Sequence, residues 1–296
     1  MPAPSPQAGP DADVLEGPVD VCVNVPRLAL DRPFTYLADA SQGAGLGSLV
    51  SVPFHGRTVD GWVLGPAEGI PGGRLLPLRK VRSPVRFFDR RLLALFRWMR
   101  ERYLVPLAAV IARSHPPRVA GEEAGLELPG SGRPGLAGAP AGRGAGPAAP
   151  GPPGAGLGRP PPASRAAGLE AYGGSGPLLE PGTVTWLRPL PGEEAEACVA
   201  AVEACLARGR QAVVLVPEAE PLPATARAVL EAFPGRAVAY AGGTPRERYR
   251  TWLRIASGAC DVVVGTRPAV FAPLARPGLL WVAREAHPGH REDRAP

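Results

Sequence analysis

The sequence predicts an α/β chain: a small β-rich N-terminal domain, a flexible linker, and a parallel α/β sheet. Three observations lead to this prediction. Short strand-like segments joined by Gly turns come first, a Gly/Pro/Ala-rich stretch follows, and strand and helix patterns then alternate. Such alternation is typical of a parallel sheet covered by helices. The predicted units are a disordered tail at 1–18, the N-terminal domain at 19–119, a linker at 120–177 and a C-terminal unit at 178–296.

The N-terminal domain begins with valines that alternate with polar residues from Val19 to Val25. That period of two is typical of a half-buried strand. Two further strands are predicted at 48–54 and 58–64, with a turn at 55–57 between them. Short strands joined in this way predict a small barrel or sandwich.

Two helices are predicted to complete this domain. Asp89 is the expected N-cap of the first, whose apolar side chains are expected to share one face: Leu92, Leu95, Phe96, Met99 and Tyr103. The second is short, contains Leu107 and Ile111, and ends before Pro116.

The linker is recognised by its composition. Between residues 130 and 162, 20 of 33 residues are Gly or Pro and seven more are Ala. Such a segment cannot bury enough apolar surface to offset the entropy lost on ordering.

The C-terminal unit is predicted to contain strands at 183–187, 211–216, 236–240, 261–264 and 278–282, with helices at 193–208 and 223–232. A third helix is expected to begin after Thr244. Pro245 at the first helical position and Glu247 at the third complete a capping box.

Charge and cysteine content narrow the class of protein. Residues 19–119 contain 15 Arg and Lys against seven Asp and Glu, an excess of +8 that suits a polyanion or a solvated Arg-rich surface. The four cysteines show no C-x-x-C spacing, so no metal site is predicted and reduced thiols in a cytoplasmic protein are expected. No apolar run reaches the roughly 18 residues needed to span a membrane.

Several motifs resemble the primosomal protein N′ (PriA) family of replication-restart helicases. The N-terminal matches are D-R-P-F-x-Y-L at 31–37, V-P-F-x-G-R at 52–57, G-x-V at 61–63 and Y-L-x-P-L at 103–107; the C-terminal matches are L-V-P-E at 215–218 and G-T-R-x-A-x-F-x-P-L at 265–274. The resemblance implies a domain that binds the 3′ end of a nascent strand at a DNA fork. It also implies that the C-terminal sheet is the first RecA-like helicase lobe.

The resemblance also assigns candidate DNA-binding residues: Tyr36, His55, Gly56, Arg57, Arg79, Lys80 and Arg267. Arg57, Arg79 and Lys80 are expected on loops or turns, where their side chains can reach a DNA backbone. Three positions depart from the family pattern. Thr35 replaces Asp, His55 replaces Gly and Arg79 replaces Lys.

The residues for ATP chemistry are degenerate. A phosphate-binding loop needs G-x-x-x-x-G-K-[ST], but residues 187–194 contain one Gly and no Lys, Ser or Thr. The magnesium-binding Asp-Glu pair is replaced by Ala283 and Arg284. The family uses ATP, Mg and Zn, yet no cofactor site and no catalytic residue is predicted in this chain.

The predicted function is that of a DNA-binding, helicase-like replication-restart protein of the actinobacterial type, which assists primosome assembly without helicase activity. Its expected partners are forked or branched DNA, with a 3′ end possible, and other primosome or replication proteins, but no membrane. One alternative is a fragment of an active ATP-dependent 3′-to-5′ DNA helicase. The other is a basic protein- or RNA-interaction module.

Overall fold

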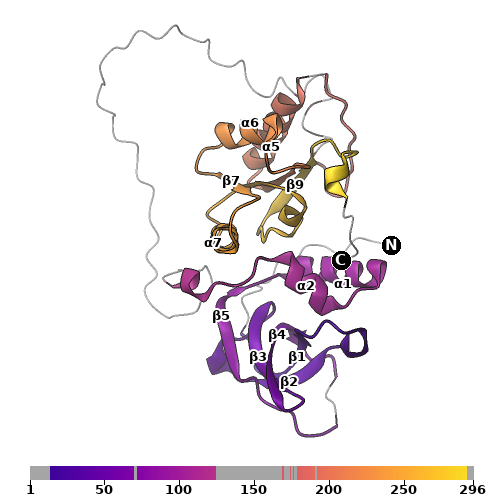
Figure 1. The fold of residues 1–296 in the computed structure, drawn as a ribbon, viewed down its shortest axis with the longest axis vertical. Helices are drawn as coiled ribbons and strands as arrows, with labels where there is room; N and C mark the ends of the chain where they lie inside the picture. Colours follow the sequence, from indigo (N-terminus) through magenta and orange to yellow (C-terminus); the bar gives the residue numbers. More distant parts are fainter. Residues whose placement is uncertain are drawn as a thin grey trace, which may run out of the picture.

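The computed structural model describes residues 14–69, 72–124, 179–190 and 192–291, with the single residues 169, 174 and 176 (Figure 1). The tail prediction for 1–13 and the linker prediction for 125–168 fall outside the described residues. The end of the predicted tail was wrong, because β1 begins at Gly17 and pairs with other strands of the sheet. The predicted α/β class is confirmed, because an antiparallel sheet at the N-terminal end is followed by a parallel sheet with helices.

The N-terminal sheet is antiparallel, with strand order β2-β1-β4-β3-β5. Its strands are β1 (Gly17–Val23), β2 (Phe34–Ala38), β3 (Ser48–Phe54), β4 (Arg57–Pro66) and β5 (Lys80–Arg86). Leu78 donates its backbone N–H to Leu37 at 2.9 Å, which brings the segment before β5 against β2. The sheet thereby closes around an interior that includes Val19, Val21, Val50, Val52 and Val63.

Gly61 permits the close pairing of β4 with β1. A Cβ at this position would lie 2.8 Å from the carbonyl oxygen of Cys22 and 2.8 Å from the side chain of Val21. A larger residue at 61 would therefore separate the strands.

Two helices, α1 (Arg90–Tyr103) and α2 (Leu107–Ser114), pack against the outside of the barrel. Asp89 caps α1 as predicted, accepting the backbone N–H of Leu92 at 2.8 Å. The predicted apolar face was partly wrong: Leu93 is buried with Phe96, whereas Tyr103 is exposed. Because α1 ends at Tyr103, no following helical turn covers this side chain.

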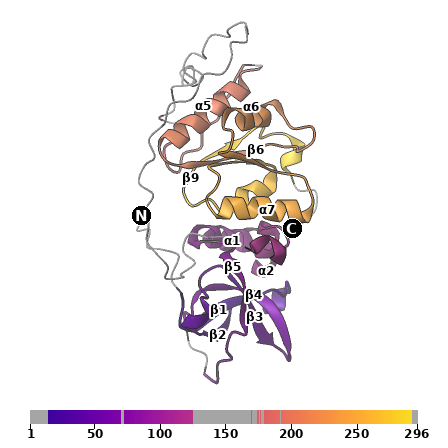
Figure 2. The ribbon, with the colours of Figure 1, turned by 90° about the vertical axis from the view of Figure 1, so that its left-hand side faces the viewer.

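The C-terminal sheet is parallel, with order β7-β8-β6-β9. Its strands are β6 (Gln211–Leu215), β7 (Ala237–Tyr240), β8 (Val262–Gly265) and β9 (Pro277–Val282). One face is covered by α5 (Glu194–Ala207) and α6 (Ala224–Ala232). The other is covered by α7 (Pro245–Ala256) and the 3₁₀ helix η4 (Arg267–Phe271) (Figure 2).

The strand predicted at 183–187 is absent. These residues are irregular and pair with no strand among the described residues. Val184 and Trp186 are 83% and 74% exposed, so the β-forming composition gains no burial here.

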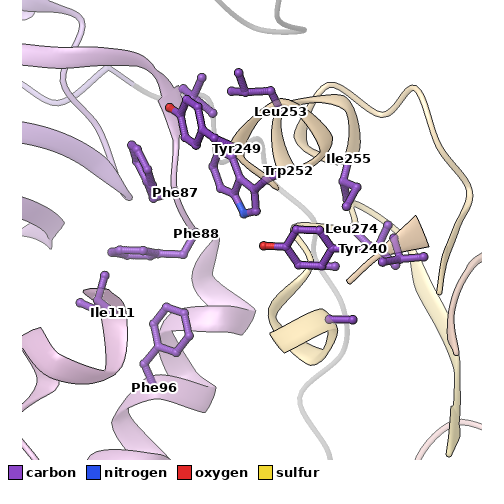
Figure 3. Packing of buried hydrophobic residues seen from close by; sticks show 14 of the residues in the cluster. Phe87, Phe88, Phe96, Ile111, Tyr240, Tyr249, Trp252, Leu253, Ile255 and Leu274 are labelled. Atoms are coloured by element: carbon purple, nitrogen blue, oxygen red, sulfur yellow. The ribbon is translucent and has the colours of Figure 1, made fainter. Parts of the chain in front are cut away.

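The two units share one hydrophobic core. A single cluster joins Trp62 of β4, Phe96 of α1, Trp252 of α7 and Tyr240 of β7. Figure 2 shows α7 lying directly along α1 and α2, and Figure 3 shows side chains from both units meeting between them.

Part of the predicted linker belongs to this fold. Residues 120–123 form the 3₁₀ helix η3 (Ala120–Glu123), and its Glu123 is buried. Leu169 is also buried and packs with Ala197, Ala200 and Ala201 of α5. The sequence did not reveal the burial of Glu123 or of Leu169, because each packs against residues that are distant in the sequence.

Candidate nucleic-acid interface

The hairpin between β3 and β4 projects two exposed residues, His55 and Gly56. Their φ angles are 46° and 75°, so both lie in the left-handed region. Two-residue hairpin loops favour this geometry because its twist matches that of the strands. Arg57 follows as the first residue of β4 and is also exposed.

Tyr36 stabilises this hairpin through a hydrogen bond to the end of β3. Its side chain is buried, and its hydroxyl donates a hydrogen bond to the carbonyl oxygen of Pro53 at 2.9 Å. Burial raises the pKa of Tyr36, so the hydroxyl keeps its proton. Tyr36 is one of the candidate DNA-binding residues, but its buried position suits holding the hairpin rather than touching a ligand.

Aromatic rings surround the base of the hairpin. The ring centroids of Phe34 and Phe54 are 5.0 Å apart, and those of Phe54 and His55 are 4.5 Å apart. The guanidinium of Arg32 lies 4.8 Å from the centroid of Phe34, close enough for a cation–π contact. Arg32 was absent from the predicted site, although it lies within the D-R-P-F motif that signalled this region.

A second group of cations lies on and just before β5. Arg79 donates its backbone N–H to Ser51 of β3 at 2.9 Å, and Lys80 is the register partner of Ser51. Lys80 was expected on a loop or turn but begins β5, a strand missing from the prediction. Lys80 and Arg82 are both exposed and share one face, because side chains alternate along a strand.

Arg57 at the hairpin and the cations of β5 are close neighbours, because both the hairpin and β5 adjoin β3. Ser51, beside Lys80, precedes Phe54 at the hairpin by three residues, which corresponds to about 10 Å along a strand. Asp60 lies 3.8 Å from Arg82 and balances part of this charge. The remaining surface is basic and open, and it suits backbone phosphates.

Thr35 has a structural partner. Its hydroxyl donates to the carboxylate of Asp20 at 2.9 Å, across the pairing of β1 with β2. A carboxylate therefore lies beside position 35, although the residue at that position is Thr rather than the Asp usual in the PriA family.

Arg267 lies apart from the other candidate residues. It begins η4 in the C-terminal unit, and its guanidinium donates to the carbonyl oxygen of Arg291 at 2.5 Å. The structure therefore groups Tyr36, the hairpin, Arg79 and Lys80 but leaves Arg267 elsewhere.

Acidic residues begin α5, where the family resemblance would place a nucleotide loop. Glu193 is the N-cap of α5, and Glu194 and Glu196 lie in its first turn. Such residues favour a helix N-terminus but repel a phosphate there. Ala283, which stands where the resemblance predicts the magnesium-binding Asp, follows β9. It is buried and donates its backbone N–H to the carbonyl oxygen of Leu215 at 2.9 Å.

The described residues show neither a cluster of metal ligands nor a membrane-spanning helix. These residues include no group of three His, Cys, Asp or Glu side chains able to hold a metal ion. The four cysteines are free and buried, and burial raises the pKa of Cys22 to about 12. None of the described helices has the length and apolar character needed to cross a bilayer.

The barrel, its two helices and the exposed basic hairpin define a DNA-binding domain joined to a parallel α/β lobe. Residues 20–116 match the family model of the 3′ DNA-binding domain of PriA. This match spans the barrel strands, the hairpin and both helices.

Over 90% of its length, the chain is similar to replication restart proteins named PriA. The probable replication restart protein PriA of Mycobacterium leprae is 32% identical over 284 residues, covering 90% of this chain and 39% of the relative. The protein of the same name from Mycobacterium tuberculosis is 32% identical over 278 residues, with 90% and 38% covered. The replication restart protein PriA of Treponema pallidum is 27% identical over 289 residues, with 90% and 38% covered.

The predicted resemblance to PriA is therefore confirmed, both by the family match over residues 20–116 and by the similarity over 90% of the chain. The chain spans somewhat more than a third of the length of these relatives.

Proposed function

We propose that this chain binds branched DNA for replication restart through the hairpin and β5 of its N-terminal domain. One observation carries the proposal. The exposed cations Arg57, Arg79, Lys80 and Arg82 lie on one small barrel within the residues matched to the PriA 3′ DNA-binding domain. Arg and Lys so placed bind backbone phosphates and fix the position of the protein on DNA.

Binding of a fork can be tested by fluorescence anisotropy with the full chain. We expect a forked DNA to bind more tightly than a linear duplex of equal length, and the affinity to fall linearly with salt on logarithmic axes. Absence of salt-dependent binding to either DNA would contradict the proposal. Equal affinity for RNA and DNA forks would favour the alternative of a general basic interaction module.

Recognition of the 3′ terminus is the finer question. The hydroxyl of Thr35 is engaged by Asp20, and His55 occupies a hairpin position where the family usually has Gly. We therefore expect that replacing the 3′ hydroxyl of the fork by a phosphate changes the affinity less than twofold. A loss of tenfold or more would show that terminal recognition survives these two departures.

We further propose that the chain acts without ATP turnover, as a scaffold for other primosome proteins in the cytoplasm. The support is the acidic start of α5 and the loss of the Lys and Asp-Glu residues that hold a nucleotide and its magnesium. Phosphate release should stay at background when fork DNA is added. Turnover near about 1 per second, ordinary for enzymes, would overturn this part and favour an active helicase.

A further inference from the structure

The outer face of α7 carries a stripe of arginines that the proposed function does not use. Arg246, Arg250 and Arg254 follow at four-residue spacing, and all three are exposed. Like charges at this spacing destabilise a helix slightly. Helix stability alone therefore gives no reason for the stripe.

The stripe is linked to β5 of the barrel through η3. Ser83 of β5 donates to the carboxylate of Glu123 at 2.7 Å, and Arg118 donates to the same carboxylate at 2.8 Å. The preceding residue, Glu122, accepts hydrogen bonds from Arg246 and Arg250 of α7. The arginines therefore lie beside β5, although they belong to the other unit.

Where η3 contacts α7, the carboxylate of Glu122 pairs with the guanidinium groups of both Arg246 and Arg250. The side chains of Arg246 and Arg250 are 67% and 57% exposed, while that of Glu122 is only 9% exposed. Hydrogen bonds from Arg250 and Arg246 lower the pKa of Glu122 to about 2, so the carboxylate is charged at neutral pH. A net positive charge remains, and each guanidinium has five N–H donors, more than one shared carboxylate can satisfy.

We propose that Arg246 and Arg250 form a second phosphate-binding site, which holds the backbone of DNA already bound at the barrel. This inference rests on the proposed function. Glu122 is the anion that occupies the two arginines in free protein, and a phosphate displaces it. The planar fork of Arg suits phosphate oxygens as well as it suits a carboxylate.

The spacing sets the length of DNA that can reach both sites. Ser83 lies three residues beyond Lys80, or about 10 Å along β5, and η3 and α7 lie beyond it. A duplex carries one phosphate per strand for about every 3.4 Å. We therefore expect an arm of about 16 base pairs held at Lys80 to reach α7 and an arm of about three base pairs to end before it.

The test compares two forks that differ in the length of one arm, with the short arm closed by a hairpin loop. In the full chain, Arg250→Gln should weaken binding to the long-arm fork about tenfold, as expected for one charge-assisted hydrogen bond. It should also reduce the salt slope by about one unit. Binding to the short-arm fork should not change. The matched control is Arg227→Gln on α6, another exposed helical arginine.

A second variant separates phosphate binding from a structural role. Glu122→Gln removes the competing carboxylate, so we expect several-fold tighter binding to the long-arm fork only. If Arg250→Gln has no effect, or if both variants weaken binding to both forks equally, the contact merely joins the two units and the proposal is wrong. The proposal would also be overturned if polyglutamate competed with the long-arm fork as strongly as unlabelled DNA does. Failure of the wild-type chain to bind even the short-arm fork would instead contradict the proposed function.

Discussion

The ring of Phe87 lies on the indole of Trp252, with centroids 5.2 Å apart and an interplanar angle of 25°. Phe87 follows β5 of the barrel, and Trp252 belongs to α7 of the parallel lobe. Tyr249 also stacks with the indole, with ring centroids 5.9 Å apart and an interplanar angle of 9° (Figure 3). This stack joins the core of the barrel to that of the lobe, although the two units are far apart in the sequence.

Removal of this indole should destabilise both units together. Trp252 is fully buried, and deleting a buried aromatic side chain costs about 3–5 kcal/mol. We expect Trp252→Ala to lower the free energy of unfolding by that amount in urea titrations. Trp98→Ala on α1 is the control, because Trp98 is 53% exposed and its loss should cost under about 1 kcal/mol. Equal effects of the two changes would contradict the shared core.

Glu123 should contribute far more to stability than an ordinary surface carboxylate. Burial alone would raise the pKa of Glu123, but hydrogen bonds from Arg118, Tyr249 and Ser83 outweigh it and lower that pKa. Breaking a buried pair by removing one partner costs about 3–5 kcal/mol, so we expect a loss in that range for Glu123→Ala. The exposed Glu101 provides the comparison, and Glu101→Ala should change the unfolding free energy by under about 0.5 kcal/mol. Similar values for the two variants would show that Glu123 is not an interdomain anchor.

His115 should make stability depend on pH. Its ring lies between Phe87, Trp62 and Trp252, and burial lowers its pKa from the usual value near 6.5. The folded protein resists the proton that the unfolded chain accepts. This contribution to stability is therefore complete above about pH 6.5 and is lost as the pH falls through the lower, folded-state pKa.

The measurement is the free energy of unfolding between pH 7.5 and pH 5.5. It should fall more steeply with decreasing pH for the wild-type chain than for His115→Phe. His55→Gln, at an exposed position, should keep the wild-type slope. A slope unchanged by His115→Phe would show that the buried imidazole is not responsible.

Tyr36 should affect the hairpin without contributing to phosphate binding. Tyr36→Phe removes the hydrogen bond to Pro53, which should cost about 1 kcal/mol of unfolding free energy. The salt slope of DNA binding should stay the same, because the side chain is buried and its hydroxyl is already bonded to Pro53. A slope reduced by a whole unit would instead place the Tyr36 hydroxyl on DNA.

Helix starts could be predicted because their signals are local. Thr244, Pro245 and Glu247 form the expected capping box of α7, and Asp89 caps α1 as expected. The alternating valines of β1 and the continuous apolar run of β8 were equally clear, because each pattern is complete within a few consecutive residues.

Other features depend on partners that the local sequence does not reveal. The segment 183–187 has strand-like composition but no paired neighbour, whereas β5 was hidden by its many cations and gains its pairing from β3. Glu122 and Glu123 followed no periodic pattern, and their role is evident only when α7 lies against η3. The site shows the same division. A motif marked the hairpin and local basic charge marked Lys80, but neither signal assigned Arg32 or the α7 arginines to the candidate site.

The most direct test of DNA binding by the barrel is the salt dependence of fork affinity for Arg79→Gln and Lys80→Gln in the full chain, with Arg227→Gln as control. If both side chains bind phosphates, each change should weaken binding at every sequence tested and reduce the salt slope by about one unit, and the double variant by about two. The control should match the wild type. Wild-type affinity and slope in the double variant would show that these residues do not bind DNA.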